Sequence, residues 1–327
     1  MTRYIIFGAG AVGGLIGARL FRAGHDVTLI ARGANRQAIA DKGLLLRTSE
    51  GEDIVPVPVV GSVSDLTLAP EDVVILAMKT QDCTAALDEL ASVAPPGIAV
   101  ACALNGIESE RMALRLFDNV YGIHDYVFAV MLRPGEVECY NGPAYGIFDI
   151  GRYPAGTDDR AEAIAADLRG AGFDSVVQPD IMRWKRGKLI ANTGNALGAA
   201  SNATEDLRDV MMAARQEAEA CYRAAGLDYA APAESMARGA KLEIRKIDGK
   251  SFFGGSTAQS LARGTPTTEV DYLSGEIARL GRAHGVATPI NTALQRIVRE
   301  LAQQHSPPGA LSPGELRARI DAQRGQN

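Results

Sequence analysis

The sequence has few of the residues that build metal sites and disulfide frameworks. Among 327 residues, its four cysteines are scattered and form no C-x-x-C pair: Cys83, Cys102, Cys139 and Cys221. Its four histidines show no metal-ligand spacing. We therefore expect no bound metal and no disulfide. Reduced thiols of this kind are typical of a cytoplasmic protein.

Long runs of one charge and long apolar runs are also missing. The formal net charge is −5 and no extended basic stretch occurs, so we expect neither nucleic acid nor a membrane surface as a partner. No apolar run approaches membrane-spanning length. Because the N-terminus leads directly into a strand-like run, we expect no signal peptide. The length and the 46% hydrophobic content predict a well-packed core and two domains rather than one.

A glycine-rich turn follows the first apolar run, residues 4–7. The turn is formed by Gly8, Ala9, Gly10, Ala11, Val12 and Gly13, and a helical pattern then continues until Gly24. Strand, G-x-G-x-x-G and helix in this order are typical of a dinucleotide-binding βαβ unit. Gly8 permits the tight turn, Gly10 lets a pyrophosphate approach the backbone, and Gly13 lets the helix pack closely. The phosphates are expected at the helix N-terminus; the alternative is a glycine-rich loop in a plain α/β domain.

The second strand-like run, residues 27–31, is followed by Arg32. NAD-binding units usually carry Asp or Glu at this place, which accepts hydrogen bonds from the ribose 2′-hydroxyl. An arginine suits a 2′-phosphate instead, and Asn35 and Arg36 follow closely. We therefore expect NADP (NADPH) as the cofactor. The alternative is that Arg32 is a solvated loop residue.

Two polar residues directly follow continuous apolar runs of the kind that buried parallel strands show. Lys79 follows residues 72–78, and Asn105 with Gly106 follows residues 97–104. In open α/β sheets, ligands bind outside the carboxyl ends of the strands. Both side chains are therefore expected at the cofactor crevice, and a solvated lysine and a turn asparagine are the alternatives.

The remainder of the first half predicts more sheet. Residues 55–60 contain two prolines and predict an edge strand, because proline cannot donate to a central ladder. Short strand-like runs and turns from 119 to 150 predict an antiparallel extension of the sheet. A helix over 161–172 and a last strand over 174–178 precede a predicted domain boundary at residue 180.

The second half predicts helix almost throughout. The fold class is therefore α/β, with a Rossmann-type dinucleotide-binding domain over 1–180, an all-α C-terminal domain over 181–327, and chemistry expected in the cleft between them.

The spacing i, i+4, i+7 predicts that Lys188, Asn192 and Asn195 share one helical face. An amine and two amides suit an oxyacid substrate; a solvated helix face is the alternative.

Several of these motifs occur together in one known family. They are the glycine turn, Lys79, Asn105-Gly106 and Trp184-x-x-x-Lys188-Leu189-x-x-Asn192. The most specific are Thr268-Glu269-Val270-Asp271-Tyr272-Leu273-Ser274-Gly275 and His284-Gly285-Val286-Ala287-Thr288-Pro289-Ile290-Asn291. In these segments, from the first strand to about Asn291, the chain resembles the ketopantoate reductases, which are NADPH-dependent 2-dehydropantoate 2-reductases.

The resemblance implies roles for individual residues. The glycine loop, Lys79 and Asn105 would bind NADPH, with Asn105 also reaching the substrate. Lys188 matches the catalytic lysine, which contacts the substrate and protonates the developing alkoxide. Glu269 matches the catalytic glutamate near the cofactor and this lysine. Asn192 matches an asparagine that holds the substrate.

Two departures from the family pattern fall in the substrate region. The family commonly has a second asparagine four residues after the first, whereas Asn195 comes three residues after Asn192. Upstream of the glutamate the family has Ser-Ser-Met-x-Gln-Asp, where this chain has Ser-Thr-Ala-Gln-Ser at 256–260. Thr257 keeps the hydroxyl of a family serine and is expected to bind the substrate, but Ser260 replaces the acid. Reductase chemistry is therefore better supported than ketopantoate itself.

The expected reaction is hydride transfer from NADPH to the ketone carbon of a small-molecule 2-oxo acid, with a lysine ammonium stabilising and protonating the oxygen. The first candidate substrate is 2-dehydropantoate, whose reduction gives pantoate for pantothenate and coenzyme A. The nearest alternative is a paralogous reductase of another 2-oxo acid or carbonyl compound. A non-catalytic NADP-binding sensor is the alternative of another class. A homodimer is compatible with the sequence, which leaves the oligomeric state open.

Overall fold

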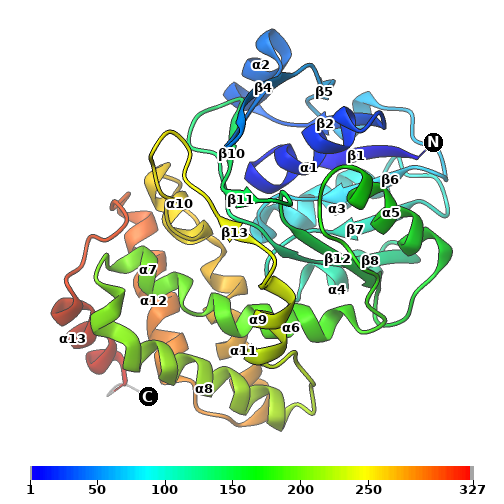
Figure 1. The fold of residues 1–327 in the computed structure, drawn as a ribbon. Coiled ribbons are helices and arrows are strands. Elements are labelled where there is room, and N and C mark those ends of the chain that lie inside the picture. The colour runs from blue at the N-terminus through cyan, green and yellow to red at the C-terminus, as the bar shows by residue number, and fades with distance from the viewer. Residues whose placement is uncertain (1, 325–327) are drawn as a thin grey trace. The chain divides into compact units, whose positions relative to one another are not determined.

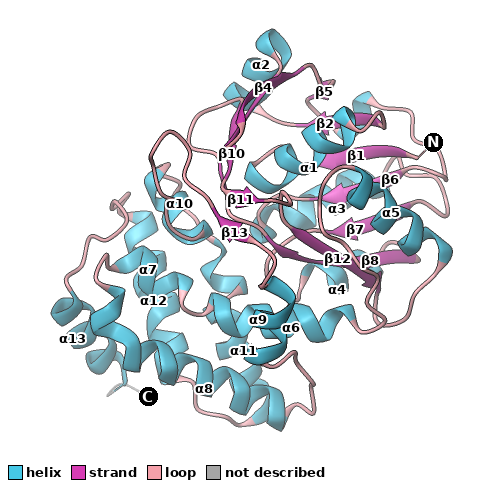
Figure 2. Ribbon diagram, viewed as in Figure 1, coloured by secondary structure: helices cyan, strands magenta, loops and turns pink. Residues whose placement is uncertain are grey.

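A computed structural model describes residues 2–324, which form an α/β region followed by helices (Figures 1 and 2). By its internal contacts the chain divides into two compact units. The first comprises residues up to 185 and returns at 233–252, and the second comprises 186–232 and the residues from 253 onward. The single boundary expected at residue 180 remains a prediction. Within residues 2–324, none of the helices combines the length and apolarity that a membrane crossing requires.

The main sheet of the first unit has seven strands among the described residues. Their spatial order is β12 (Ile147–Arg152), β8 (Asn119–Tyr126), β7 (Ala99–Cys102), β6 (Val73–Leu76), β1 (Arg3–Phe7), β2 (Asp26–Ile30) and β5 (Val59–Val60). All neighbouring strands are parallel except β8 and β12. The chain order reverses at β1, between β2 and β6. The carboxyl ends of β1 and β6 therefore flank the point where open α/β sheets bind ligands.

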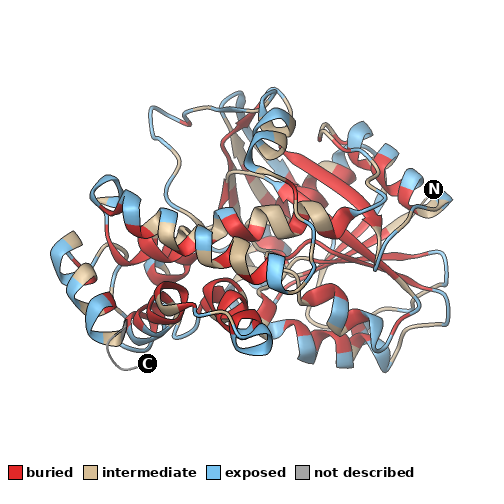
Figure 3. Cartoon of the chain, turned by 90° about the horizontal axis from the view of Figure 1, so that it is seen from below, coloured by how far each residue is buried: buried red, intermediate tan, exposed pale blue. Residues whose placement is uncertain are grey.

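Helices cover both faces of this sheet and create two cores. Ile6 packs on one face with residues of α1 (Ala11–Arg22) and α5 (Asp159–Gly170). Ile5 packs on the other face with residues of α3 (Cys83–Ala91) and α4 (Ser109–Leu114). Successive strand residues point to opposite faces, so a strand buried on both faces needs a continuous apolar run. The buried strands stand out in red in Figure 3, and they confirm the predicted parallel α/β fold.

A smaller sheet accompanies the main one. Its order is β4 (Gly51–Val55), β3 (Leu44–Thr48), β10 (Glu136–Cys139) and β9 (Ala129–Val130). The predicted edge strand over 55–60 is correct only at β5, because the two prolines separate β4 from β5. The predicted antiparallel extension is correct for β12 but wrong for β8, which continues the parallel ladder. The expected last strand over 174–178 forms only isolated bridges to β12.

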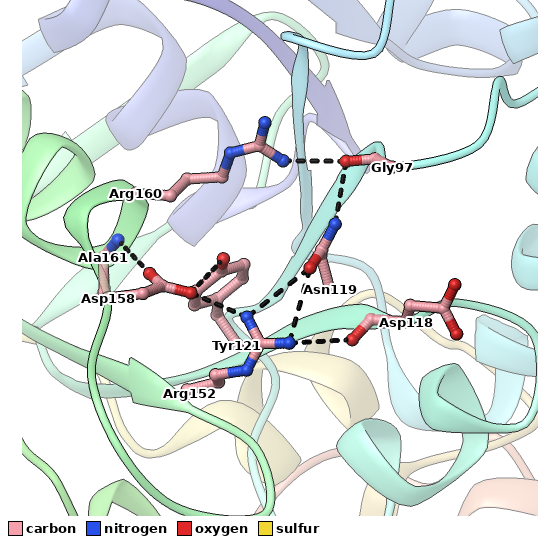
Figure 4. A network of polar contacts seen from close by, with 8 residues as sticks. All are labelled: Gly97, Asp118, Asn119, Tyr121, Arg152, Asp158, Arg160 and Ala161. Carbon is pink, nitrogen blue, oxygen red and sulfur yellow. Dashed lines mark hydrogen bonds and ion pairs between the residues drawn. The ribbon is translucent and has the colours of Figure 1, made fainter.

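A polar network joins β8, β12 and the start of α5 (Figure 4). Arg152 and the Tyr121 hydroxyl both donate to Asp158, at 2.7 and 2.9 Å, and the Ala161 amide donates to it at 2.8 Å. Burial alone would raise the pKa of Asp158, but these three hydrogen bonds and the charge of Arg152 hold the pKa below its usual value. The carboxylate thus caps α5 and fixes the edge of the sheet.

The stretch 233–252 returns to the first unit. It contains most of α9 (Pro232–Gly239) and the strand β13 (Glu243–Ile244), which pairs with β11 (Asn141–Gly142). Arg238 donates twice to buried Asp149, at 2.9 and 2.7 Å, and once to Asp174 at 2.7 Å. The prediction of helix almost throughout the second half missed β13. Its two residues are exposed and too few to form an alternating apolar pattern.

The second unit is helical, as predicted. α6 (Ile181–Asn192) begins in the first unit and ends in the second. The other helices are α7 (Asn195–Ala200), α8 (Arg208–Ala224), α10 (Ser256–Ala262), α11 (Ser274–His284), α12 (Pro289–Gln303) and α13 (Pro313–Arg324). At the start of α12, the Glu217 carboxylate accepts hydrogen bonds from the backbone amides of Ile290 and Asn291. The side chain of Asn291 also donates to Glu217 and to the Ala214 carbonyl, so the last residue of the family-like segment has a structural role.

Candidate active site

The glycine loop joins β1 to α1, and its glycines meet different constraints. Gly8 has φ +107°, and a Cβ there would lie 2.7 Å from the Met78 amide nitrogen. A Cβ on Gly13 would lie 2.1 Å from the Gly8 carbonyl oxygen, whereas a Cβ on Gly10 would meet nothing within 4 Å. The first turn of α1 has no side-chain cap and no acid. The open backbone at Gly10 and these uncapped amides fit the pyrophosphate of a dinucleotide.

The backbone of this loop is also hydrogen-bonded to a residue outside the loop, Asn35. Ala9 is buried, and Ala11 and Val12 form the first turn of α1. The amide of Asn35 donates to the Ala9 carbonyl at 2.7 Å and accepts from the Gly135 amide at 2.8 Å. Asn35 therefore tethers the glycine loop to the 133–136 turn. The sequence indicated Asn35 only as a residue close to Arg32 and not as this tether, because no local pattern indicates a partner 100 residues away.

Arg32 lies where the sequence predicts it, after β2 and before α2 (Gly33–Lys42). Its side chain is 69% exposed and forms an ion pair of 2.9 Å with Glu89 of α3. The carboxylate of Glu89 also accepts from the Ser62 hydroxyl and the Val63 amide. The arginine that is expected to bind a phosphate is therefore paired with an acid. The sequence did not indicate this pair, because Glu89 is 57 residues away from Arg32.

Lys79 and Asn105 follow the adjacent parallel strands β6 and β7. Lys79 precedes a short 3-10 turn, Thr80–Asp82, and the Thr80 hydroxyl donates to the Asn105 carbonyl at 3.3 Å. Both side chains are half-buried. The structure therefore brings the two predicted residues to the same edge of the sheet, and their contacts with a cofactor remain predictions.

A buried ion pair contacts the end of β7, just before Asn105. Lys185 and Glu110 are 3% and 0% exposed and are joined by a hydrogen bond. The Lys185 ammonium also donates to the carbonyls of Leu104, at 2.9 Å, and Cys102, at 3.4 Å. All three of its N–H donors thus have acceptors. Sequence reasoning overlooked Lys185, although it stands inside the Trp184-to-Asn192 segment.

The helix that carries Lys188 ends earlier than predicted. Lys188 and Asn192 lie one turn apart on α6, both half-buried. The Thr193 hydroxyl then donates to the Ile190 carbonyl at 2.7 Å, and the Gly194 amide bonds to Ala191, three residues back. The helix is interrupted there, and Asn195 begins α7. The single continuous helix that this spacing assumes is therefore wrong at Asn195, because the helix is interrupted at Thr193, whose hydroxyl bonds the backbone, and at Gly194.

Asn195 instead faces the turn before α10. A Cβ built on Gly255 would lie 2.9 Å from its side-chain oxygen. Thr257, in the first turn of α10, is 2% exposed, and its hydroxyl has no hydrogen-bond partner among the described residues. Ser256 is half-buried, and its hydroxyl oxygen, which is inaccessible, also has no partner there. Buried hydroxyls are usually paired, so both fit a ligand that supplies the partner, and Ser256 is a candidate that the sequence analysis missed.

Glu269 is also buried, at 2% exposure, and begins a 3-10 turn, Glu269–Tyr272. The Thr268 hydroxyl caps this turn by accepting from the Val270 amide at 3.3 Å. Arg263 lies within the electrostatic influence of Glu269. Burial lowers the pKa of Arg263, and the negative charge of Glu269 opposes that shift. The second unit therefore holds an arginine and a glutamate in a partly dry environment.

The cysteines are not candidate nucleophiles. All four are buried and unpaired. Burial raises the pKa of Cys83 and Cys139 to about 12 and that of Cys221 to about 11, and it raises the pKa of Cys102 well above its usual value. Their thiols are therefore protonated and inert at neutral pH.

A parallel sheet with an open glycine loop, followed by a helical unit bearing a lysine and amides, defines a dinucleotide-dependent oxidoreductase. More specifically, the chain belongs to the ketopantoate reductase PanE/ApbA family. The family's N-terminal model matches residues 4–155, and its C-terminal model matches residues 180–302. A 2-dehydropantoate 2-reductase of Pyrococcus horikoshii is 29% identical over 300 residues, covering 90% of this chain and 95% of that protein.

Solved structures agree with this assignment. A PanE/ApbA family ketopantoate reductase from Ralstonia eutropha JMP134 is 30% identical, with a TM-score of 0.78 over 93% of this chain and 99% of the other. A D-mandelate dehydrogenase in a ternary structure with NADH and anilino(oxo)acetate has a TM-score of 0.79 over 92% and 99% of the two chains. At 22% identity, that second likeness shows the fold alone.

Proposed function

We propose that this protein reduces a 2-oxo acid with NADPH, and that 2-dehydropantoate is the first candidate substrate. Its product would be pantoate, the precursor of pantothenate and coenzyme A. The main support for the proposal is that one chain of this family contains both an open glycine loop and a set of polar side chains suited to an oxyacid. These are Lys188, Asn192 and Thr257, whose hydroxyl has no partner among the described residues. When bound, NADPH supplies the hydride.

The first unit would hold the cofactor. The amides from Gly8 to Gly13 would receive its pyrophosphate, and Arg32 its 2′-phosphate. Lys79 and Asn105, at the carboxyl ends of β6 and β7, would contact the rest of the nucleotide, and Asn105 also the substrate. The family resemblance supports Glu269 as a further contact near the nicotinamide.

The second unit would hold and protonate the substrate. As the carbonyl carbon gains hydride, its oxygen gains negative charge, which the Lys188 ammonium stabilises and then neutralises by giving a proton. Asn192, Asn195 and the hydroxyl of Thr257 would donate to the carboxylate or to a substrate hydroxyl and so orient the carbonyl. Glu269 would hold the ammonium in position.

The identity of the 2-oxo acid is a finer proposal. Counted from Thr257 as the second serine of Ser-Ser-Met-x-Gln-Asp, the acid position of the family pattern falls on Leu261 and not on Ser260. The break at Thr193-Gly194 moves Asn195 to a different helix. These differences favour testing other 2-oxo acids beside 2-dehydropantoate, including aryl-substituted ones, because D-mandelate dehydrogenase shares the fold. A sensor that holds NADP without chemistry would need no proton donor such as Lys188.

The test is a substrate panel. The purified protein is mixed with NADPH and each 2-oxo acid, and the loss of absorbance at the nicotinamide band is followed. Saturable oxidation of NADPH with at least one 2-oxo acid is expected. Binding of NADPH without turnover of any member of the panel would contradict the proposal and favour the sensor.

A further inference from the structure

Three charged residues lie together at the carboxyl end of β2. Arg32 and Arg36 are four residues apart at the start of α2, where the Arg36 amide donates to the Arg32 carbonyl at 3.4 Å. Arg32 is the N-cap residue of α2, with extended backbone, and Arg36 lies in the first turn of the helix. The Arg36 guanidinium lies against Gly61, the neighbour of Ser62. Glu89 reaches the same place from α3. The expected 2′-phosphate site therefore holds two cations and one anion.

The anion is fixed independently of the arginines. One carboxylate oxygen of Glu89 accepts from the Ser62 hydroxyl and from the Val63 amide, the latter at 3.2 Å. Its other oxygen accepts from Arg32 at 2.9 Å. Glu89 is 22% exposed, whereas Arg32 is 69% exposed. The carboxylate is therefore the anchored member of the pair, and the guanidinium is the movable one.

Arg36 differs from Arg32 in its surroundings. Its guanidinium lies against Gly61, where an added Cβ would be 3.6 Å from the Arg36 Cζ. Among residues 2–324 the structure gives its side chain no hydrogen bond and no ion pair. The carboxylate of Asp65 accepts from the backbone amides of Gly61 and Ser62. Arg36 is exposed, so its five N–H donors are available to an incoming anion.

We infer that Arg36 is a second cation for the 2′-phosphate of the cofactor and that Glu89 opposes this phosphate. The inference rests on the proposed function, since it takes NADPH as the cofactor. Arginine binds phosphate through two parallel N–H donors, and Arg36 can do so without losing a partner. Glu89 neutralises part of the charge of Arg32 and repels a second anion at that arginine.

Glu89 has the opposite effect on NADH. A carboxylate at the end of β2 is the group that accepts hydrogen bonds from a ribose 2′-hydroxyl. Position 32 lacks an acid, and Glu89 supplies one from another helix. The balance between Arg36 and Glu89 therefore sets the preference for NADPH over NADH, and it makes that preference moderate.

The test measures equilibrium dissociation constants for NADPH and NADH by calorimetric titration at one ionic strength. Arg36→Ala should raise the Kd for NADPH about tenfold, as expected for a charge-assisted hydrogen bond, and change that for NADH by less than about twofold. Glu89→Gln should lower the ratio of the NADPH Kd to the NADH Kd by about threefold to fivefold, as expected for an exposed charge pair. Matched controls are Lys42→Ala on α2 and Asp88→Asn on α3, both exposed.

Unchanged NADPH binding in Arg36→Ala, or an unchanged ratio in Glu89→Gln, would overturn the inference. These results are distinct from those of the substrate panel. A protein that reduces 2-oxo acids but lacks either shift refutes the inference and leaves the proposed function intact. A protein that shows both shifts and reduces no 2-oxo acid supports the inference and refutes the proposed function.

Discussion

The ammonium of Lys185 donates to the backbone carbonyl of Leu104 at 2.9 Å, one residue before Asn105. The same ammonium is paired with buried Glu110, whose other oxygen accepts from the Ser109 hydroxyl at 3.1 Å. A charge pair with so little exposure is costly to separate, because the remaining charge has no water. The end of β7 and the start of the Asn105 turn are therefore anchored by a residue of α6.

Replacing Lys185 by methionine should destabilise the protein by about 3–5 kcal/mol, since Glu110 would be left buried without its cation. Urea denaturation measures this loss. The double variant Lys185→Met with Glu110→Leu should recover most of it, because an apolar pair of similar volume removes both charges. A single variant within about 1 kcal/mol of the parent, a loss too small for an uncompensated buried charge, would contradict the anchoring role.

Arg32→Asp should weaken NADPH binding more than NADH binding. The change removes a cation and adds a second carboxylate beside Glu89, which repels a 2′-phosphate. Fluorescence titration of both nucleotides measures the preference, with Arg319→Asp, from another exposed arginine–glutamate pair, as the control. A parent protein that prefers NADH, or an Arg32→Asp variant with an unchanged preference, would leave Arg32 a surface residue.

Substrate-holding residues should affect KM. Asn192→Ala and Thr257→Ala should each raise KM for the best 2-oxo acid by about tenfold, the value of one hydrogen bond to a charged group. Their NADPH affinity should stay near that of the parent. Steady-state kinetics separates the two effects. Normal turnover by Asn195→Ala would show that Asn195 does not bind the substrate. A normal KM in both other variants would contradict the proposed substrate-binding role of Asn192 and Thr257.

Stability should fall in acid, partly through Asp149. Burial would raise the pKa of Asp149, but the nearby His124 and the hydrogen bonds and charge of Arg238 hold the pKa below its usual value. A carboxyl whose pKa is lower in the folded than in the unfolded protein stabilises the fold above the unfolded pKa, about 3.9, and this contribution is lost as pH falls through the folded pKa.

Asp149→Asn should therefore lower Tm at pH 6 and reduce the further fall in Tm between about pH 5 and pH 3. Scanning calorimetry across this range checks the expectation, and Asp88→Asn, which changes an exposed carboxyl, is the control. An unaltered pH profile in Asp149→Asn would show that its carboxylate titrates alike in the folded and unfolded states.

The sequence predicts the first βαβ unit and the all-helical second unit because both depend on local patterns. The G-x-G-x-x-G turn, the continuous apolar strands and the helical periodicity can each be recognised within about twenty residues of sequence. The same locality explains why Lys79 and Asn105 could be placed at one edge of the sheet, since parallel neighbours share their carboxyl ends.

Other features depend on distant partners and stay hidden. Asn35 is hydrogen-bonded to Gly135, and Lys185–Glu110 and Arg32–Glu89 are ion pairs. No local sequence pattern predicts any of these contacts. The break before Asn195 is different, because its causes are local. Thr193 and Gly194 are both visible in the sequence, but a regular i, i+4, i+7 spacing outweighed them.

We propose that Lys188 gives the proton in the reduction of a 2-oxo acid. Lysine suits this role because it is cationic before transfer, whereas Lys188→Arg should restore little activity, since a guanidinium hardly gives up a proton. The most direct test is kcat of Lys188→Ala at saturating NADPH and saturating 2-oxo acid. We expect a loss on the order of 10²–10⁴-fold with NADPH binding retained, because the glycine loop, and not Lys188, is expected to hold the phosphates. A kcat within a few-fold of the parent would contradict the claim and turn attention to water or Lys79 as the source of the proton.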